Sequence, residues 1–235
     1  VIGGGRYEQF RRQFVGPLRR SFSEASRAKF RKELLKKLFL FPTSSTAFYR
    51  WKDGSTKLTA GGWKKVYAHE LSGGTKRRIF AALNEVFEET GYQQPRNTYG
   101  MIIEDRGTQI TFSAVGQGVV DSLGTKRGVR VKKEWNKKNN KLRLRMAGLL
   151  AKKLPDLEER VGGLTSIDVT RKGIDKAYGI RQIEKILRVP RRHMLFVGDA
   201  IFPGGNDYAV VRTGVDYLKV SGPEDAKKVI KLLFV

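Results

Sequence analysis

The C-terminal third of the chain alternates between short apolar runs and amphipathic segments, and this alternation constrains the fold more than any other feature. Thr165–Val169 and Met194–Val197 are short runs of the kind that form buried strands, and Lys176–Leu187 between them has apolar residues at helical spacing. A helix, a strand and a second helix are predicted to follow at Tyr208–Thr213, Tyr217–Val220 and Pro223–Leu233. This order predicts the α/β class, with a mainly parallel sheet and flanking helices.

The middle of the chain has longer strand patterns with a more regular alternation. Its predicted elements are a hairpin arm at Ala47–Trp51 with a turn at Asp53-Gly54, a helix at Thr75–Thr90, strands at Gly100–Ile103 and Gln109–Ala114, and a helix at Trp135–Leu154. We therefore expect an α+β insert at residues 49–161, which divides the α/β layer into residues 1–48 and 162–235. The chain begins at Val1 rather than Met, and we expect the first part of the layer to be incomplete at its N-terminus.

The net charge of the chain is +24, and it is unevenly distributed. Residues 1–40 and 126–145 carry +8 and +9 of it. Such an excess predicts attraction to polyanions, of which nucleic acid is the commonest, although a solvated basic surface is the alternative. In these segments we expect backbone phosphate contacts, with Trp135 stacking on a base. The candidates are Arg11, Arg12, Arg19, Arg20, Lys132, Lys133, Trp135, Lys137, Lys138, Lys141, Arg143 and Arg145.

The composition excludes several kinds of site. The chain has no cysteine, so disulfides, thiolate metal sites and a cysteine nucleophile are excluded, and two histidines are too few for a histidine-rich zinc site. No run of about 18 apolar residues occurs, so we expect no membrane span. These features predict an intracellular protein, in the cytoplasm or an organelle.

Two aspartates surround the glycine-rich turn after the Met194–Val197 run. Ligands of α/β sheets collect at the carboxyl ends of the strands, where Asp199 would lie. Mg²⁺ prefers one or two carboxylates together with water and substrate phosphate. Asp199 could bind the ion directly, and Asp207 could supply a second oxygen or orient a bound water. Alternatively, both carboxylates cap the turn and the following helix.

Two basic residues are candidates for phosphate binding. Lys176 lies at a strand-to-helix junction, where an ammonium group can neutralise phosphate and carboxylate charge. Arg106 lies in the insert and could bind phosphate from the opposite side. Either could instead be a surface charge.

Several stretches together resemble the haloacid-dehalogenase-like (HAD) superfamily, in the branch with an α+β cap of the phosphomannomutase kind. The resemblance rests on GDAIFPGGND, DVTRKGIDKAYGI and EDRGTQITFSAVGQ, with VIGGGRYEQF at the start and PEDAKKVIKLLF at the end. It spans the chain in order from Val1, and the Pro-Gly-Gly-Asn-Asp loop is its most specific part. The resemblance implies a Rossmann-like HAD core, a mainly parallel sheet with flanking helices, and an inserted α+β cap.

The resemblance also implies roles for individual residues. Asp199 would be a Mg²⁺ ligand and Asp207 its acidic companion. Lys176 matches the core lysine that holds nucleophile and phosphate, and Asp175 is a weaker candidate beside it. Arg106 matches a cap arginine that binds substrate in the mutases. The N-terminal Gly4, Gly5 and Arg6 would contribute to binding the substrate phosphate.

The chain departs from the family pattern in its nucleophile. In the family, an Asp-x-Asp motif on the first core strand supplies the attacking aspartate and an acid–base, and this motif occurs nowhere in the 235 residues. The mutases also have arginine where Gln117 ends SAVGQ, and phosphatase relatives have Ser or Thr at Gly3.

Two functions remain open. The first is a HAD-type, Mg²⁺-dependent phosphoryl-transfer scaffold for a phosphorylated small molecule such as a sugar phosphate, inactive as the chain stands because the nucleophilic aspartate is missing. The second is an inert HAD-fold protein repurposed as a basic RNA-binding component of a ribonucleoprotein such as a ribosome. The second accounts for the charge, and the first accounts for the aspartate loop.

Overall fold

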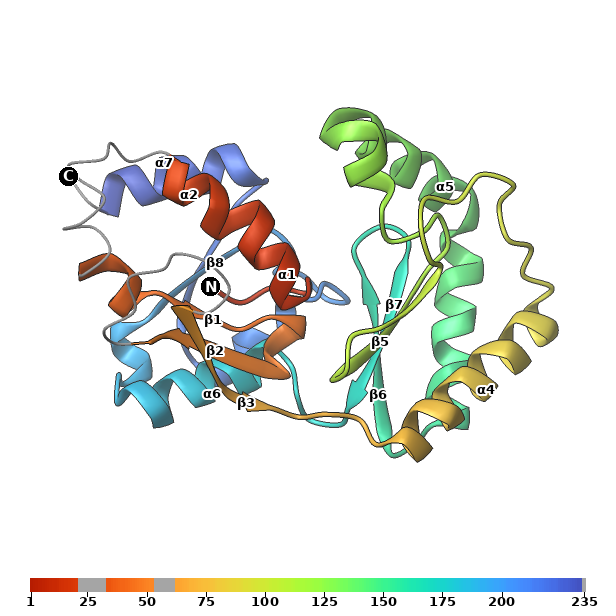
Figure 1. Ribbon diagram of the computed structural model, residues 1–235, viewed down its shortest axis with the longest axis horizontal. Coiled ribbons are helices and arrows are strands. Elements are labelled where there is room, and N and C mark those ends of the chain that lie inside the picture. The colour runs from red at the N-terminus through yellow and green to blue at the C-terminus, as the bar shows by residue number, and fades with distance from the viewer. Residues whose placement is uncertain (21–32, 53–61, 234–235) are drawn as a thin grey trace.

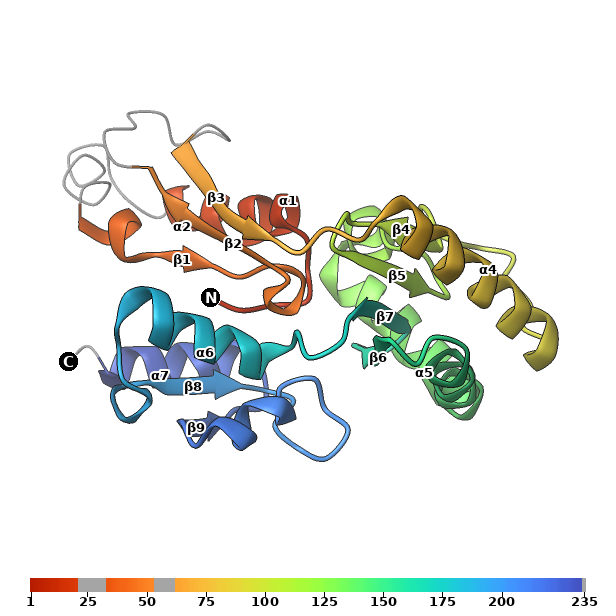
Figure 2. The ribbon, with the colours of Figure 1, turned by 90° about the horizontal axis from the view of Figure 1, so that it is seen from below.

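The computed structural model describes residues 1–20, 33–52 and 62–233, which form two lobes (Figure 1). One lobe contains the N-terminal and C-terminal parts of the chain, and the other contains the middle. The chain crosses between them twice, after β3 and after β7 (Figure 2). In the described parts of the chain, no helix is both long and apolar enough to cross a membrane.

The N-terminal part forms a three-stranded antiparallel sheet. It begins with consecutive helical segments, α1 (Tyr7–Phe10), η1 (Arg11–Val15) and α2 (Gly16–Arg20), and continues through β1 (Phe39–Leu40), η2 (Thr43–Ser45), β2 (Ala47–Trp51) and β3 (Trp63–Ala68). The sheet has the order β1-β2-β3. The hairpin predicted at Ala47–Trp51 is present as β2 and β3, while its predicted turn at Asp53-Gly54 lies outside the described residues. Phe41 stacks on Phe48 in its core.

The middle lobe is a four-stranded antiparallel sheet covered by two helices. The helices are α4 (Gly73–Thr90) and α5 (Val119–Lys153), and the strands are β4 (Ile103–Asp105), β5 (Gln109–Ser113), β6 (Leu157–Gly162) and β7 (Ser166–Arg171). The strand order is β4-β5-β7-β6. Ile79, Leu83, Ile110 and Met146 are fully buried between helices and sheet. The C-cap of α4 is Gly91, whose φ of 63° suits glycine and ends the helix where the sequence predicts.

The strand predicted at Thr165–Val169 belongs to this antiparallel sheet, and its assignment to a parallel core sheet is wrong. Observed β7 pairs antiparallel with β5 and with β6. Its residues alternate between the buried Ile167 and Val169 and the polar Asp168 and Thr170, which is the pattern of an antiparallel strand. The predicted boundary after residue 161 therefore falls within a hairpin, and the predicted insert also includes β2 and β3, which pair with β1.

The C-terminal part returns to the first lobe. It contains α6 (Lys176–Leu187), the short helix η4 (Arg191–His193), β8 (Leu195–Gly198), η5 (Tyr208–Thr213), β9 (Asp216–Lys219) and α7 (Pro223–Leu233). Strands β8 and β9 are parallel, and Ile2 forms a parallel bridge with Phe41. The alternation of helix and strand thus follows the prediction, but among the described residues parallel pairing is confined to these two places.

Candidate functional site

A buried ion pair lies at the carboxyl end of β8. Lys176 is the first residue of α6, and its ammonium group donates a hydrogen bond to Oδ1 of Asp207. The other carboxylate oxygen, Oδ2, accepts from the backbone N–H of Ala200 at 3.0 Å. Lys176 is 6% exposed and Asp207 is 2% exposed. Both carboxylate oxygens of Asp207 are therefore occupied by protein contacts, which fix the position of the lysine.

The loop between the two aspartates needs glycine for steric reasons. A Cβ atom at Gly198 would lie 2.6 Å from Oδ2 of Asp207, and one at Gly205 would collide with the carbonyl oxygen of Ala200. The loop therefore closes tightly enough to bring Asp207 back to the end of β8. This explains the Gly-Asp and Pro-Gly-Gly pattern that the sequence shows.

Asp199 is exposed beside this pair, at the mouth of a cavity of about 600 Å³ that Lys176 and Asp207 also line. The described residues contain no cluster of three or more His, Cys, Asp or Glu that could hold a metal ion. The available donor is the carboxylate of Asp199, since both oxygens of Asp207 already accept hydrogen bonds. One direct carboxylate fits the few protein ligands that Mg²⁺ takes alongside water and phosphate. A metal held this way would depend on the substrate for part of its coordination.

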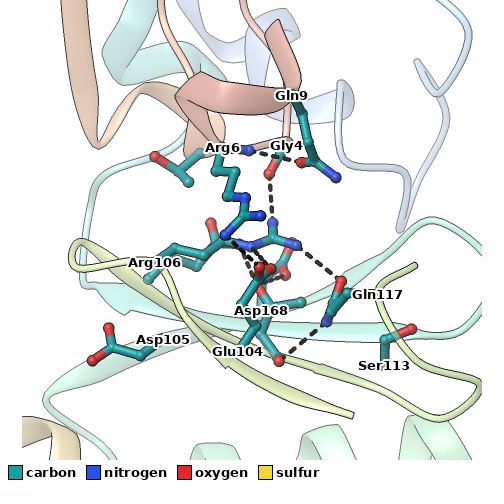
Figure 3. Close-up of polar contacts among 12 residues, drawn as sticks. Gly4, Arg6, Gln9, Glu104, Asp105, Arg106, Ser113, Gln117 and Asp168 are labelled. Atoms are coloured by element: carbon teal, nitrogen blue, oxygen red, sulfur yellow. Dashed lines mark hydrogen bonds and ion pairs between the residues drawn. The ribbon is translucent and has the colours of Figure 1, made fainter. Parts of the chain in front are cut away.

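Arg106 forms a second cluster, between the lobes (Figure 3). Its Nε donates to Glu104 at 2.7 Å, Nη1 to the carbonyl oxygen of Gly4 at 3.0 Å, and Nη2 to Oε1 of Gln117 at 2.9 Å. The side chain is 6% exposed. The predicted phosphate-binding arginine thus joins the insert to the glycine-rich N-terminal segment.

Arg6 approaches the same carboxylate from the first lobe. Its Nη1 lies 2.8 Å from Oε1 of Glu104, and its backbone N–H donates to Gln9 at 2.9 Å. Gly5 accepts from the N–H of Thr43, which anchors the glycine segment on η2. The structure therefore brings together Gly4, Arg6 and Arg106, with Gly5 adjacent, and their role in binding phosphate stays a prediction. Among the described residues, Gly4, Arg6 and Arg106 form no hydrogen bond or ion pair with Lys176, Asp199 or Asp207.

Sequence reasoning missed the acidic members of this cluster. Glu104 is buried between two arginines, and Asp168 of β7 accepts a hydrogen bond from Thr111 at 2.8 Å. Burial raises the pKa of the Asp168 carboxyl, while the nearby Arg106 opposes the shift. The available signal in β7 was the polar Asp168 between the apolar Ile167 and Val169, because a carboxylate on the polar face of a strand needs a polar neighbour across the sheet.

A strained segment adjoins the cluster. Thr43, Ser44 and Ser45 have φ values of 48°, 53° and 78°, which are unfavourable for residues other than glycine. Thr46 Oγ1 lies 2.7 Å from Thr108 Oγ1 in the insert, and Thr43 Oγ1 lies 3.2 Å from the same atom. These buried hydroxyl contacts between the lobes hold the segment in its strained form.

Asp175 has a structural role at the start of α6. Its Oδ1 accepts from the N–H of Tyr178 at 2.8 Å and thereby caps the N-terminus of α6, and its Oδ2 pairs with Arg212. The residue therefore positions Lys176, the first residue of that helix.

The basic candidates separate into buried and exposed groups. Arg143 is buried and donates to the carbonyl oxygens of Gly162 and Gly163, and Trp135 packs against the hydrophobic core of the insert. Arg143 therefore lies in the interior of the insert, while base stacking by the partly buried Trp135 stays a prediction. Burial, followed by the charge of Arg106, lowers the pKa of Lys132. The exposed candidates on α5 are Lys133, Lys137, Lys138, Lys141 and Arg145.

The N-terminal candidates lie on the helical segments of the first lobe. Arg12 pairs with Asp121 of α5 at 2.5 Å, and the guanidinium of Arg11 lies 5.9 Å from the ring centroid of Tyr7. Arg20 is exposed at the end of α2, and Arg19 belongs to the same helix. Arg12 thus connects the two lobes rather than being free for an external phosphate.

The sequence of this chain is similar to a known protein family and to individual curated proteins. The family described as eukaryotic phosphomannomutase matches residues 91–235. The phosphomannomutase of Saccharomyces cerevisiae is 31% identical over 134 residues, which are 55% of this chain and 51% of that protein. The phosphomannomutase of Dendrobium officinale is 32% identical over 136 residues, which are 55% and 51% of the two chains. The chain spans about half the length of these curated relatives.

Solved structures with a similar fold have lower identity. An IMP-bound mutant of the IMP-nucleotidase of Plasmodium falciparum has a TM-score of 0.59 at 15% identity, covering 98% of this chain and 57% of that one. SMU.1108c of Streptococcus mutans has a TM-score of 0.52 at 15% identity, covering 97% of this chain and 76% of the other. These similarities confirm the predicted mixed α/β fold of the HAD type.

Proposed function

Because the chain belongs to the eukaryotic phosphomannomutase family, we propose that it is a HAD-type scaffold that binds Mg²⁺ and a phosphorylated small molecule, and that it does not transfer phosphate as it stands. One observation carries this proposal. The buried Lys176–Asp207 pair and the exposed Asp199 line one cavity, but the sequence has no Asp-x-Asp motif to supply an attacking carboxylate.

Each residue of the cavity has a distinct part in binding. Mg²⁺ bound at Asp199 would offset the charge of a phosphate and supply Lewis acidity. The ammonium of Lys176 has three donors and uses one for Asp207, so it can also bind a phosphate oxygen. Asp207 holds that ammonium in place, and the N–H of Ala200 holds Asp207.

The cluster of Arg6 and Arg106, together with the family, indicates the class of substrate. Arg6 and Arg106 flank a cavity of about 240 Å³ between the lobes, where a guanidinium can bind an oxyanion in two places at once. The phosphomannomutase relatives indicate a sugar phosphate as the first candidate. Gln117 donates to the carbonyl of Thr111 and accepts from Arg106, so it orients the arginine and adds no positive charge of its own.

Catalysis and binding are tested separately. The 235-residue chain is incubated with p-nitrophenyl phosphate and Mg²⁺, and we expect no Mg²⁺-dependent hydrolysis. Thermal unfolding is then followed with Mg²⁺ and inorganic phosphate, and we expect both together to raise Tm because they bind the folded state. Asp199→Asn should abolish this increase, and Asp216→Asn, which changes an exposed carboxylate of β9, is the matched control.

The outcomes distinguish the two parts of the proposal. Hydrolysis above the blank would show that the missing motif does not make the chain inactive. A Tm that does not respond to Mg²⁺ and phosphate, or that responds equally in Asp199→Asn, would contradict the binding site itself.

RNA binding is a second candidate function, and the surface of α5 favours it. The part of α5 that follows the kink at Gly124 exposes Lys133, Lys137, Lys138 and Lys141 within about two turns. A row of exposed lysines suits the phosphates of RNA, since each contact releases counterions, and the one acid among them, Glu134, lies within reach of Arg130. The net charge of +24, which phosphate-ester binding does not require, also supports this candidate.

RNA affinity is measured by fluorescence anisotropy with a labelled single-stranded RNA at several salt concentrations. We expect the affinity to fall steeply between 50 mM and about 200 mM salt. Replacing Lys137, Lys138 and Lys141 together by Glu should weaken binding at least about tenfold. The same replacement of the exposed Lys227, Lys228 and Lys231 on α7 is the control, and equal losses would indicate general charge attraction instead of a site on α5.

A further inference from the structure

A further cavity between the lobes lies beside strand β6 and has a volume of about 680 Å³. Helix α5 and β6 of the insert form one wall, and the loop that follows β8, together with η5, forms the other. Figure 2 shows this loop extending from the end of β8 toward the lobe that contains β6 and α5. We call this cavity the β6 groove. It shares no lining residue with the cavities that contain Asp199 or Arg106, so different side chains line the three cavities.

Large apolar side chains are exposed on both walls of the β6 groove. Phe202 of the loop is 47% exposed and Tyr208 of η5 is 41% exposed. Leu144 of α5, on the other wall, is 51% exposed. Apolar side chains gathered on an exposed surface mark binding sites. Aromatic rings opposite an aliphatic side chain suit a flat ligand with apolar faces, such as a nucleobase.

The interior of the β6 groove is electrically balanced. Its charged lining residues are Arg143, Arg160, Arg212, Glu158, Glu159 and Asp175. Arg160 pairs with Glu158, and Arg212 pairs with Asp175. Burial raises the pKa of the Glu159 carboxyl, so this acid favours its neutral form more than an exposed one does. A balanced interior suits the uncharged base of a nucleotide better than its phosphate.

Positive charge lies at the rims of the β6 groove. On the loop side, the ammonium of Lys219 lies 5.6 Å from the ring centroid of Phe202. On the α5 side, Lys141 precedes Leu144 by three residues and Lys137 precedes Lys141 by four, so these side chains share one face of the helix. Both lysines are exposed. The lysine row of α5 therefore leads into the groove, and a further cation lies on its other side.

We infer that the β6 groove takes one base of a single-stranded RNA, in contact with Leu144 and with the rings of Phe202 and Tyr208. The phosphates on the two sides of this base lie on the lysines of α5 and on Lys219. The inference rests on RNA binding, the second candidate function, and specifies how the RNA is bound. A base within a duplex has its faces covered by its neighbours, so the groove selects single strands.

The two basic rims favour a nucleic acid chain over an isolated nucleotide. A nucleotide brings the same base but has phosphate on one side, and it would leave one rim without a partner. A chain has a phosphate on each side of every internal base and satisfies both rims. Because any base can stack on an aromatic ring, we expect little preference for sequence.

The first measurement changes the RNA and leaves the protein unmodified. A short fluorescein-labelled single-stranded RNA is titrated with the 235-residue chain, and anisotropy is followed at several salt concentrations. An RNA of the same length with abasic nucleotides keeps every phosphate and lacks the bases. We expect the abasic RNA to bind at least about tenfold more weakly. The dependence of its affinity on salt should be the same, because the phosphate contacts are unchanged.

The second measurement changes the groove. The double variant Phe202→Ala, Tyr208→Ala should weaken binding of the base-containing RNA at least about tenfold and should not affect the abasic RNA. Tyr217→Ala removes an exposed ring of β9 outside the groove and is the matched control. Circular dichroism checks that each variant is folded. Ultraviolet cross-linking of a 4-thiouridine RNA to the unmodified chain, mapped by mass spectrometry, should identify peptides that contain Phe202 or Tyr208.

The outcomes separate the groove from RNA binding itself. Equal affinity for the base-containing and abasic RNAs, with affinity still lost when the α5 lysines are replaced, would overturn the groove and leave RNA binding on α5 in place. If the unmodified chain binds no RNA, the second candidate function fails and the groove with it. Binding of uridine monophosphate as tight as that of the RNA would identify a free nucleotide as the occupant and would also overturn the inference.

Discussion

At the scale of single residues, the least tolerant part of the candidate site is the Lys176–Asp207 pair. Both side chains are buried, and each is the charged partner of the other. Removing one partner of a buried ion pair leaves an uncompensated charge, whereas replacing both can be nearly neutral. The pair therefore fixes the position of Lys176, and the protein loses stability mainly when one of the two partners is removed alone.

Lys176→Met is expected to lower the free energy of unfolding by about 3–5 kcal/mol. The double variant Lys176→Met, Asp207→Asn should recover a large part of this loss. Urea denaturation followed by circular dichroism measures both values. Lys185→Met changes an exposed lysine of the same helix and should stay within about 0.5 kcal/mol of the unmodified chain. An equal loss in the single and double variants would show that the lysine stabilises by packing instead.

Most elements were predictable from the sequence, and their partners were not. The helices at Gly73–Thr90, Lys176–Leu187 and Pro223–Leu233 follow from apolar spacing and end signals. Strand β7 was recognised as a strand but assigned to the wrong sheet, because strand pairing depends on contacts between residues distant in the chain. The alternation of apolar and polar residues at Ile167, Asp168 and Val169 favours an antiparallel neighbour, so the sequence did contain a signal for the correct sheet.

For the candidate site as well, the sequence predicted which residues take part but not the contacts that they make. Asp199, Asp207 and Lys176 were named from the motif, and the structure places them around one cavity. The motif did not reveal that Asp207 is fully occupied by Lys176 and Ala200, nor that Arg106 is buried against Glu104. Whether a charged side chain is already paired inside the protein depends on side-chain packing, which a sequence pattern does not contain.

For the whole molecule, the connection between the lobes depends on contacts at the two linkers. His69, directly after β3, has its Nε2 2.8 Å from the hydroxyl of Tyr178 in the first turn of α6. Arg171, at the end of β7, donates to the carbonyl oxygen of Glu70 at 2.6 Å. Burial, and secondarily the charge of Arg171, lowers the pKa of His69. The hydrogen bond from Arg171 to Glu70 thus joins the two linkers, and the neighbouring His69 contacts α6 through Tyr178.

The stability of the protein should consequently decrease as the pH falls through about 6.5, the ordinary pKa of histidine. Because the pKa of His69 is lower in the folded chain, the unfolded chain binds more protons at this residue in this range, so protonation favours unfolding. His69→Gln should reduce the slope of the free energy of unfolding between pH 7.5 and pH 5.5, measured by urea denaturation. His193→Gln, which changes an exposed histidine before β8, is the matched control. An unchanged slope in His69→Gln would rule out this histidine as the source.

The sequence by itself determined the class of fold, the position of the aspartate loop, the basic character and the absence of an Asp-x-Asp motif. These depend on local spacing, composition and short motifs. Only the tertiary structure decided that β7 joins the insert, that Glu104 lies between Arg6 and Arg106, and that Lys176 and Ala200 occupy both carboxylate oxygens of Asp207. The physical reason is that each of these features arises where segments far apart in the chain pack together, and local patterns leave such packing undetermined.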